Sequence, residues 1–169
     1  MKRITKKNED YKGIEWVLKA RSKEITRYNM NFINVKDGEF IATDGHRLHI
    51  YKFTVQIEDG NYELINANSD EIILEISPNI EYPEWKHIIP SKEPTKIIEI
   101  RCYSKNLSVA YTDLVRAVPN ENTVNLDYFK DINSINNTVI FSVFEKNEPI
   151  KFVSGRHRGL IMPMRTLAF

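Results

Sequence analysis

The sequence predicts an α+β protein in which antiparallel sheets carry two helices on one face. Apolar residues recur at helical spacing in two stretches, over 9–23 and 126–132, whereas most other apolar runs are short, β-branched or alternating. Turn signals such as Asp37-Gly38 separate neighbouring strand-like runs, as they do in hairpins. The order strand, helix, three strands occurs once at each end of the chain, which predicts two structural repeats.

The first repeat is expected within the first 55 residues. Residues 1–6 alternate weakly as a short strand, and Asn8 is placed to cap the helix that follows. Three strands are then expected: one that contains the alternating residues Tyr28, Met30 and Phe32, one over 39–43, and one over 46–55.

The helix predicted over 9–23 has two different faces. Its apolar residues share one face, and Lys12, Lys19 and Lys23 share the opposite face with Trp16. The lysines are either a solvated surface or a set of DNA contacts.

The middle of the chain is less regular, and residues 57–115 are interpreted as an insertion in a single domain of residues 1–169. Strands are expected over 62–66 and 71–76, followed by a segment with four prolines between 77 and 94. Residues 96–103 and 107–111 are expected to form a hairpin.

The second repeat begins where Asn125 is placed to cap a helix over 126–132. Asn136-Asn137 marks a turn, and three strands follow at 139–144, 150–154 and 160–164.

Composition narrows the classes of function. The 169 residues are 41% hydrophobic and 28% charged, with a net charge of +1, so no broad basic field indicates nucleic acid binding. The single cysteine excludes a disulfide framework and favours a cytoplasmic location. No apolar run reaches the length of a membrane span, so no membrane contact is expected.

The stretch FIATDGHRLHI, residues 40–50, is the main candidate site. His46 and His49 point to opposite faces of a strand, so they are poor joint metal ligands, and no cofactor motif is present. Asp44 and His46 form either an acid/base pair or, as we prefer, a tight turn followed by a strand. Cys102 has no identifiable catalytic partner. The remaining interpretation is an edge that receives a peptide.

Four segments resemble the bacterial replicative sliding clamp, the beta subunit of DNA polymerase III. ATDGHRL, residues 42–48, is similar to a motif of the clamp's middle domain, and LIMPMR, residues 160–165, is similar to its C-terminal motif. YPEWKHIIP, residues 82–90, and VNLDYFKDI, residues 124–132, also resemble clamp segments, and all four occur in clamp order.

The resemblance implies a hydrophobic cleft that binds short peptides of polymerases and other replication proteins, without catalysis, cofactor or metal. One wall would be Thr43, Gly45, His46, Arg47 and Leu48, and the other Met162, Pro163, Met164 and Arg165. Lys12, Lys19 and Lys23 are the candidate contacts to double-stranded DNA. Methionine suits such a cleft because its flexible side chain adapts to different partners.

The chain also departs from the family, whose clamps have three domains per chain and close rings of six domains around DNA. One domain per chain would require six copies for a ring, and the short length suggests a phage or mobile-element protein. The family's cleft lies between two domains, and the tail at 166–169 is a candidate to fill it. The leading hypothesis is therefore a self-associating clamp-like processivity protein. The alternative is a monomeric or dimeric adaptor that binds the same peptides without encircling DNA.

Overall fold

The computed structural model describes residues 1–25, 27–119 and 122–165. The chain divides into two compact units, Met1–Glu84 and Trp85–Phe169. The boundary falls inside the proline-rich segment. Within the described residues, no helix has the length and apolar character needed to cross a membrane.

The described residues of the first unit form one helix and six strands, which pair in the order β1-β6-β5-β2-β3-β4, all antiparallel. The elements are β1 (Lys2–Thr5), α1 (Tyr11–Leu18), β2 (Ile33–Lys36), β3 (Glu39–Thr43), β4 (Arg47–Lys52), β5 (Gly60–Ala67) and β6 (Glu71–Ile76). The Asp37-Gly38 turn joins β2 to β3 as expected, with both residues at positive φ, 52° and 78°.

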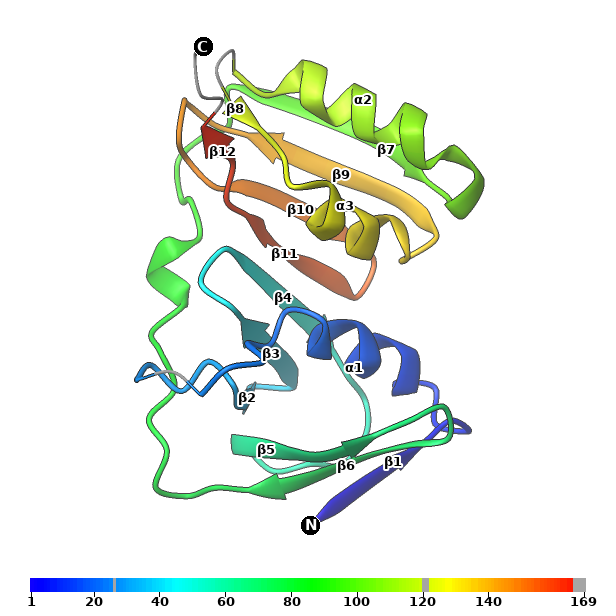
Figure 1. Cartoon of the computed structure of the whole chain (residues 1–169), viewed down its shortest axis with the longest axis vertical. Helices are drawn as coiled ribbons and strands as arrows, with labels where there is room; N and C mark the ends of the chain where they lie inside the picture. The colour runs from blue at the N-terminus through cyan, green and yellow to red at the C-terminus, as the bar shows by residue number, and fades with distance from the viewer. Residues whose placement is uncertain (26, 120–121, 166–169) are drawn as a thin grey trace. The chain divides into compact units, whose positions relative to one another are not determined.

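Helix α1 packs against β3, β4 and β6 and covers the core of the first unit (Figure 1). Ile14 and Val17 of the helix are fully buried, as are Phe40 and Ile50 of the strands. Gly13 is required for this packing, because a Cβ atom at that position would lie only 2.1 Å from Cζ of Tyr51. The glycine therefore lets a tyrosine ring lie directly against the helix.

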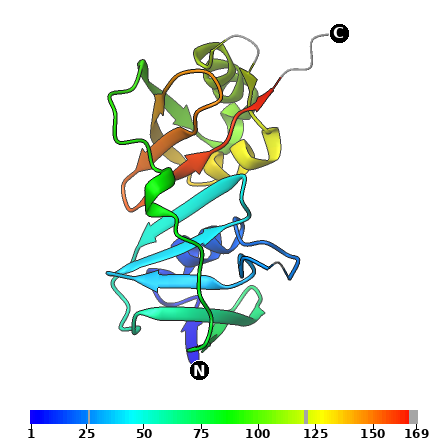
Figure 2. The same cartoon turned by 90° about the vertical axis from the view of Figure 1, so that its left-hand side faces the viewer.

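The first unit ends in a strap, residues 77–84, that runs without regular structure past its strands (Figure 2). The Ser77 N–H donates to the Asn61 carbonyl (2.7 Å), and Asn61 Nδ2 donates to the Ile80 carbonyl (2.6 Å). Further along, Asn29 Nδ2 donates to the Glu81 carbonyl (2.9 Å). These bonds fix the path of a segment whose prolines prevent it from joining the sheet.

In the part of the second unit that the structure describes, four antiparallel strands pair in the order β11-β10-β9-β7, and two short strands form a separate pair, β12-β8. Its elements are the 3₁₀ turns Lys86–Ile88 and Ser104–Asn106, β7 (Lys96–Cys102), α2 (Leu107–Ala117), β8 (Asn122–Thr123), α3 (Leu126–Asn133), β9 (Asn137–Val143), β10 (Ile150–Ser154), β11 (His157–Ile161) and β12 (Met164–Arg165).

Helices α2 and α3 cover one face of this sheet (Figure 1). A row of rings forms the core beneath them: Tyr111, Phe129, Phe141 and Phe152 lie with successive ring centroids 5.6, 6.2 and 6.3 Å apart. Helix α3 begins as the sequence predicts, because Asn125 Oδ1 accepts the N–H groups of Asp127 (2.8 Å) and Tyr128 (3.4 Å).

The α+β fold class and the order strand, helix, three strands in each unit are confirmed. A third helix, α2, replaces the strand predicted over 107–111, and β7 pairs with β9 instead. The helix follows from an apolar spacing that the hairpin interpretation overlooked, since Leu107, Ala110 and Leu114 recur at positions i, i+3 and i+7.

Two further expectations in the first unit are wrong. The alternating residues 28–32 lie in turns, and strand β2 begins only at Ile33. Helix α1 ends at Leu18, because the N–H groups of Lys19, Ala20 and Arg21 each bond three residues back and tighten the chain into a final turn.

Residues 57–115, interpreted as an insertion, supply strands to both units. They include β5 and β6 of the first unit, and β7 with most of α2 in the second. The interpretation of residues 1–169 as one domain with an insertion stays a prediction.

Candidate functional site

The turn segment, residues 43–48, joins β3 to β4 and is held largely by its own side chains. Thr43 Oγ1 donates to the Arg47 carbonyl (2.6 Å) and accepts the N–H of Gly45 (3.1 Å). Gly45 has φ of 90°, a conformation that residues with a Cβ atom rarely adopt. The Asp-Gly pair thus supplies turn chemistry, as the sequence suggests.

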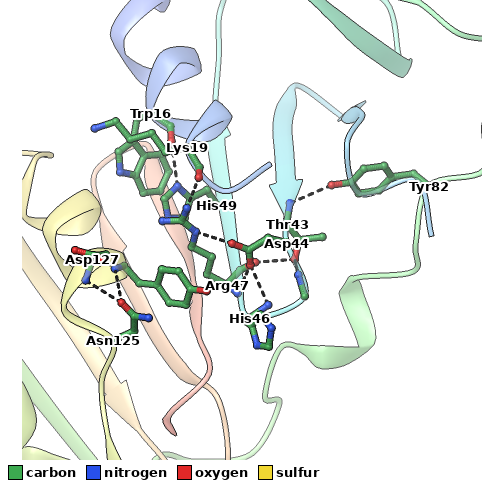
Figure 3. Close-up of polar contacts among 12 residues, drawn as sticks. Trp16, Lys19, Thr43, Asp44, His46, Arg47, His49, Tyr82, Asn125 and Asp127 are labelled. Atoms are coloured by element: carbon green, nitrogen blue, oxygen red, sulfur yellow. Dashed lines mark hydrogen bonds and ion pairs between the residues drawn. The ribbon is translucent and has the colours of Figure 1, made fainter. Parts of the chain in front are cut away.

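Asp44 is the acceptor around which the turn forms (Figure 3). Its Oδ1 accepts the N–H groups of His46 (3.0 Å) and Arg47 (3.1 Å), and its Oδ2 pairs with Arg47 Nε (3.1 Å). The His46 side chain is exposed. Within the described part of the chain, His46 bonds the Asp44 carboxylate through its backbone N–H and not through its ring. This geometry assigns Asp44 a structural role and does not form the acid/base pair considered from the sequence.

Arg47 has internal partners at both ends of its guanidinium group. Besides the Asp44 carboxylate, its Nη2 donates to the carbonyl of Lys19, directly after the last residue of α1. The side chain is only 12% exposed. The negative, C-terminal end of the helix dipole favours a cation at this position. Arg47 therefore links the turn segment to α1.

The two histidines of the motif have different surroundings. The His49 ring stacks on Trp16 with centroids 3.9 Å apart and planes within 4°, and its Nδ1 lies 3.0 Å from the Trp16 carbonyl oxygen (Figure 3). His49 and Trp16 are both buried. The expectation that Trp16 shares an exposed face with the lysines is therefore wrong, because its ring packs onto β4.

The C-terminal segment, residues 162–165, belongs to the second unit and is more open. Met162 and Pro163 are half-buried, Met164 is 42% exposed, and Arg165 is exposed. Met164 pairs with Thr123, and Arg165 with Asn122, in the β12-β8 pair. The tail at 166–169 lies outside the described residues.

The three candidate DNA-contact lysines do not form one helical stripe. Lys12 lies on α1, Lys19 directly follows the helix, and Lys23 lies four residues further on. All three side chains are exposed. The helix over 9–23 from which their common face was predicted is wrong, because α1 ends at Leu18. Their role as DNA contacts stays a prediction.

Other candidate chemistry can be placed as well. Cys102 is fully buried, and burial raises the pKa of its thiol to about 12, so the sulfur is protonated at neutral pH. The described residues contain no group of three or more His, Cys, Asp or Glu side chains suited to a metal ion.

One residue next to the turn segment was not among the predicted site residues. The hydroxyl of Tyr82 accepts the N–H of Thr43 (3.1 Å), so the strap contacts the turn segment directly (Figure 3). The side chain is half-buried, and burial of its hydroxyl raises the pKa of Tyr82. Its position at the start of YPEWKHIIP is the sequence signal that points to it.

Comparison with solved structures finds proteins of similar fold. The chain is similar to the DNA polymerase III beta subunit of Thermotoga maritima, with 13% identity and a TM-score of 0.67 over 98% of this chain and 65% of that one. The beta subunit of Borrelia burgdorferi in complex with a natural product gives 16% identity and a TM-score of 0.65, over 99% and 65%. The Pseudomonas aeruginosa sliding clamp bound to griselimycin gives 13% and 0.64, over 98% and 66%.

No family model and no curated protein matches the sequence, so the expected phage or mobile-element origin gains no support. The chain spans about two thirds of the length of the clamps that it resembles. Nearly all of its residues take part in that likeness, which extends over both compact units. The chain therefore has the fold of the bacterial sliding clamp.

Proposed function

We propose that the chain is a non-catalytic, clamp-like protein of DNA replication that binds short peptides of partner proteins. The observation that carries this proposal is the sliding-clamp fold over 98% of the chain, together with clamp-like sequence at the turn and C-terminal segments. Some of the similar clamps hold a natural product or griselimycin, which are ligands of those proteins.

The proposed peptide contacts of the first unit are Thr43, Gly45, His46, Arg47 and Leu48 of the turn segment. Those of the second unit are Met162, Pro163, Met164 and Arg165 of the C-terminal segment. The two segments have complementary character. The turn segment is fixed by internal hydrogen bonds and presents the exposed His46, whereas the C-terminal segment offers partly exposed methionines. A fixed polar turn with adaptable apolar side chains suits recognition of related but different peptides.

The experiment is a fluorescence-anisotropy titration with a labelled clamp-binding peptide from a polymerase C-terminus. Saturable binding is expected, and Met164→Ala should weaken it by about tenfold or more, as for an anchor residue. Val153→Ala, at a similarly exposed apolar position of the same unit, is the matched control and should bind as the wild type. A folded wild type without saturable binding contradicts the proposal.

Self-association into a ring around DNA is the extended form of the proposal. Among the described strands of each unit, β1 pairs only with β6 and β7 only with β9, so each has an edge through which further strands can pair. Replacing Lys12, Lys19 and Lys23 by Glu should then weaken DNA binding at low salt. The same change at the exposed Lys6, Lys7 and Lys105 is the control.

The adaptor function has its own supporting observation. Helix α3 carries Asp127 and Asp131 beside a single Lys130, and that lysine is paired with Asp127 (3.1 Å). Such a helix is a poor lining for a DNA channel. A monomer or dimer by native mass spectrometry that binds the peptide, but no DNA at low salt, would select the adaptor over the ring.

A further inference from the structure

We propose that Tyr82 is a positioning residue that holds the turn segment in the conformation required for partner binding. The inference rests on the proposed function and names a residue that the clamp-like motifs of the two segments do not include. It begins with the backbone of Thr43, where strand β3 ends.

Thr43 pairs with Leu48 of β4, but on the β2 side of β3 no described strand lies opposite it. Strand β2 pairs with β3 from Ile41 to Glu39 and starts only at Ile33, so it does not extend alongside Thr43. The phenol oxygen of Tyr82 accepts this N–H at 3.1 Å. A buried backbone N–H is costly to leave unpaired, and Thr43 is only 6% exposed. The Tyr82 hydroxyl therefore supplies the acceptor that a longer β2 would have provided.

Thr43 is also the residue on which the turn depends. Its side chain bonds both the Gly45 N–H and the Arg47 carbonyl, and the next residue, Asp44, accepts two further N–H groups. A displacement of Thr43 would therefore reach His46, the exposed residue of the turn. Tyr82 acts on the site through this backbone and not through the partner peptide.

Hydrogen bonds hold the strap in place directly before Tyr82. Asn61 links the strap to the sheet, because its Nδ2 donates to the Ile80 carbonyl and its Oδ1 accepts from Asn34 Nδ2 (2.7 Å). Asn29 holds the next residue, Glu81. Two successive residues before Tyr82 are thus attached to the first unit. Because burial raises the pKa of the phenol above its usual value, the hydroxyl is neutral at physiological pH.

Tyr82→Phe is the test, because it removes the hydroxyl and keeps the ring. Tyr62→Phe is the matched control, since the Tyr62 hydroxyl also bonds the backbone of the first unit, donating to the Glu58 carbonyl (2.9 Å). Two readouts are compared: amide hydrogen exchange at Thr43, Gly45 and His46, and affinity for the labelled polymerase peptide. Thermal unfolding shows whether the two variants are equally stable.

Tyr82→Phe should speed exchange at Thr43 by about tenfold and weaken peptide binding by about fivefold, as expected for one hydrogen bond, while Tyr62→Phe changes neither. Unchanged exchange at Thr43 overturns the proposal, and so does faster exchange with unchanged peptide affinity. A wild type that binds no peptide contradicts the proposed function and overturns the binding role of Tyr82. If Tyr82→Phe then still speeds exchange at Thr43, the bond from Tyr82 to Thr43 is established as a structural contact only.

Discussion

The two units of the chain are stabilised in different ways. In the first unit, carboxylates hold loops to the sheet: Asp10 and Asp44 each accept several hydrogen bonds from neighbouring backbone groups. In the second unit, a row of aromatic rings fills the space between the sheet and two helices. Hydrogen bonds to a carboxylate depend on its ionisation, whereas packing of rings does not. The two units should therefore respond differently to pH and to substitution.

The largest effect is expected from the aromatic row. Phe141 is fully buried and has ring neighbours on both sides, Phe129 and Phe152. Phe141→Ala should lower the free energy of unfolding by about 3–5 kcal/mol, because it removes buried apolar surface and leaves a cavity. Urea denaturation followed by circular dichroism measures the loss. Val153→Ala, at a partly exposed position of the adjacent strand, should cost much less, and equal losses would contradict the assignment of Phe141 to the core.

A smaller, pH-dependent effect is expected from Asp10. Its carboxylate is fully buried and accepts the Thr54 and Val55 N–H groups (2.8 and 2.9 Å) and the Tyr51 hydroxyl (3.1 Å). Burial opposes ionisation, but these hydrogen bonds outweigh it, so the pKa of Asp10 lies below its usual value of 3.8. Asp10→Asn can turn its carbonyl oxygen toward the two N–H groups, which bond the same carboxylate oxygen, but it puts an N–H₂ donor in place of the oxygen that accepts from Tyr51. It also removes the negative charge that strengthens these bonds, so it should cost about 1–3 kcal/mol at neutral pH.

The sign of the pH dependence follows from the lowered pKa. The ionised carboxylate stabilises the fold fully above pH 3.8, and this contribution is lost as the pH falls through the lower pKa of the folded state. The difference in unfolding free energy between wild type and Asp10→Asn should therefore shrink below pH 3.8. Asp113→Asn, at an exposed position of α2, serves as the control. A difference that stays constant down to about pH 2 would contradict the role of the carboxylate.

The smallest effect on stability is expected at Met164. Its side chain is 42% exposed and lies in a two-residue strand, so Met164→Ala should change the free energy of unfolding by no more than about 0.5 kcal/mol. Thermal unfolding beside the peptide titration checks this. A large loss of stability would mean that Met164 serves the fold and that any weakened binding is indirect.

The candidate site shows which structural features can be predicted from residue patterns and which cannot. The Asp-Gly turn at 44–45 and the strands on either side follow from local chemistry, because turn residues and alternation act over a few positions. The partners of Arg47 and His49 could not be predicted, since Lys19 and Trp16 lie 28 and 33 residues away in the sequence. Long-range contacts of this kind depend on how α1 packs against β4.

The sequence by itself determined the α+β class, the order of elements in each repeat, the Asp37-Gly38 hairpin and the Asn125 cap. Each of these depends on side chains acting on the adjacent backbone. Only the tertiary structure decided that Trp16 is buried, that Arg47 bonds the Lys19 carbonyl, and that the Tyr82 hydroxyl accepts the N–H at the end of β3. The physical reason is the same in each case: these features depend on groups that become neighbours only when separate segments pack together.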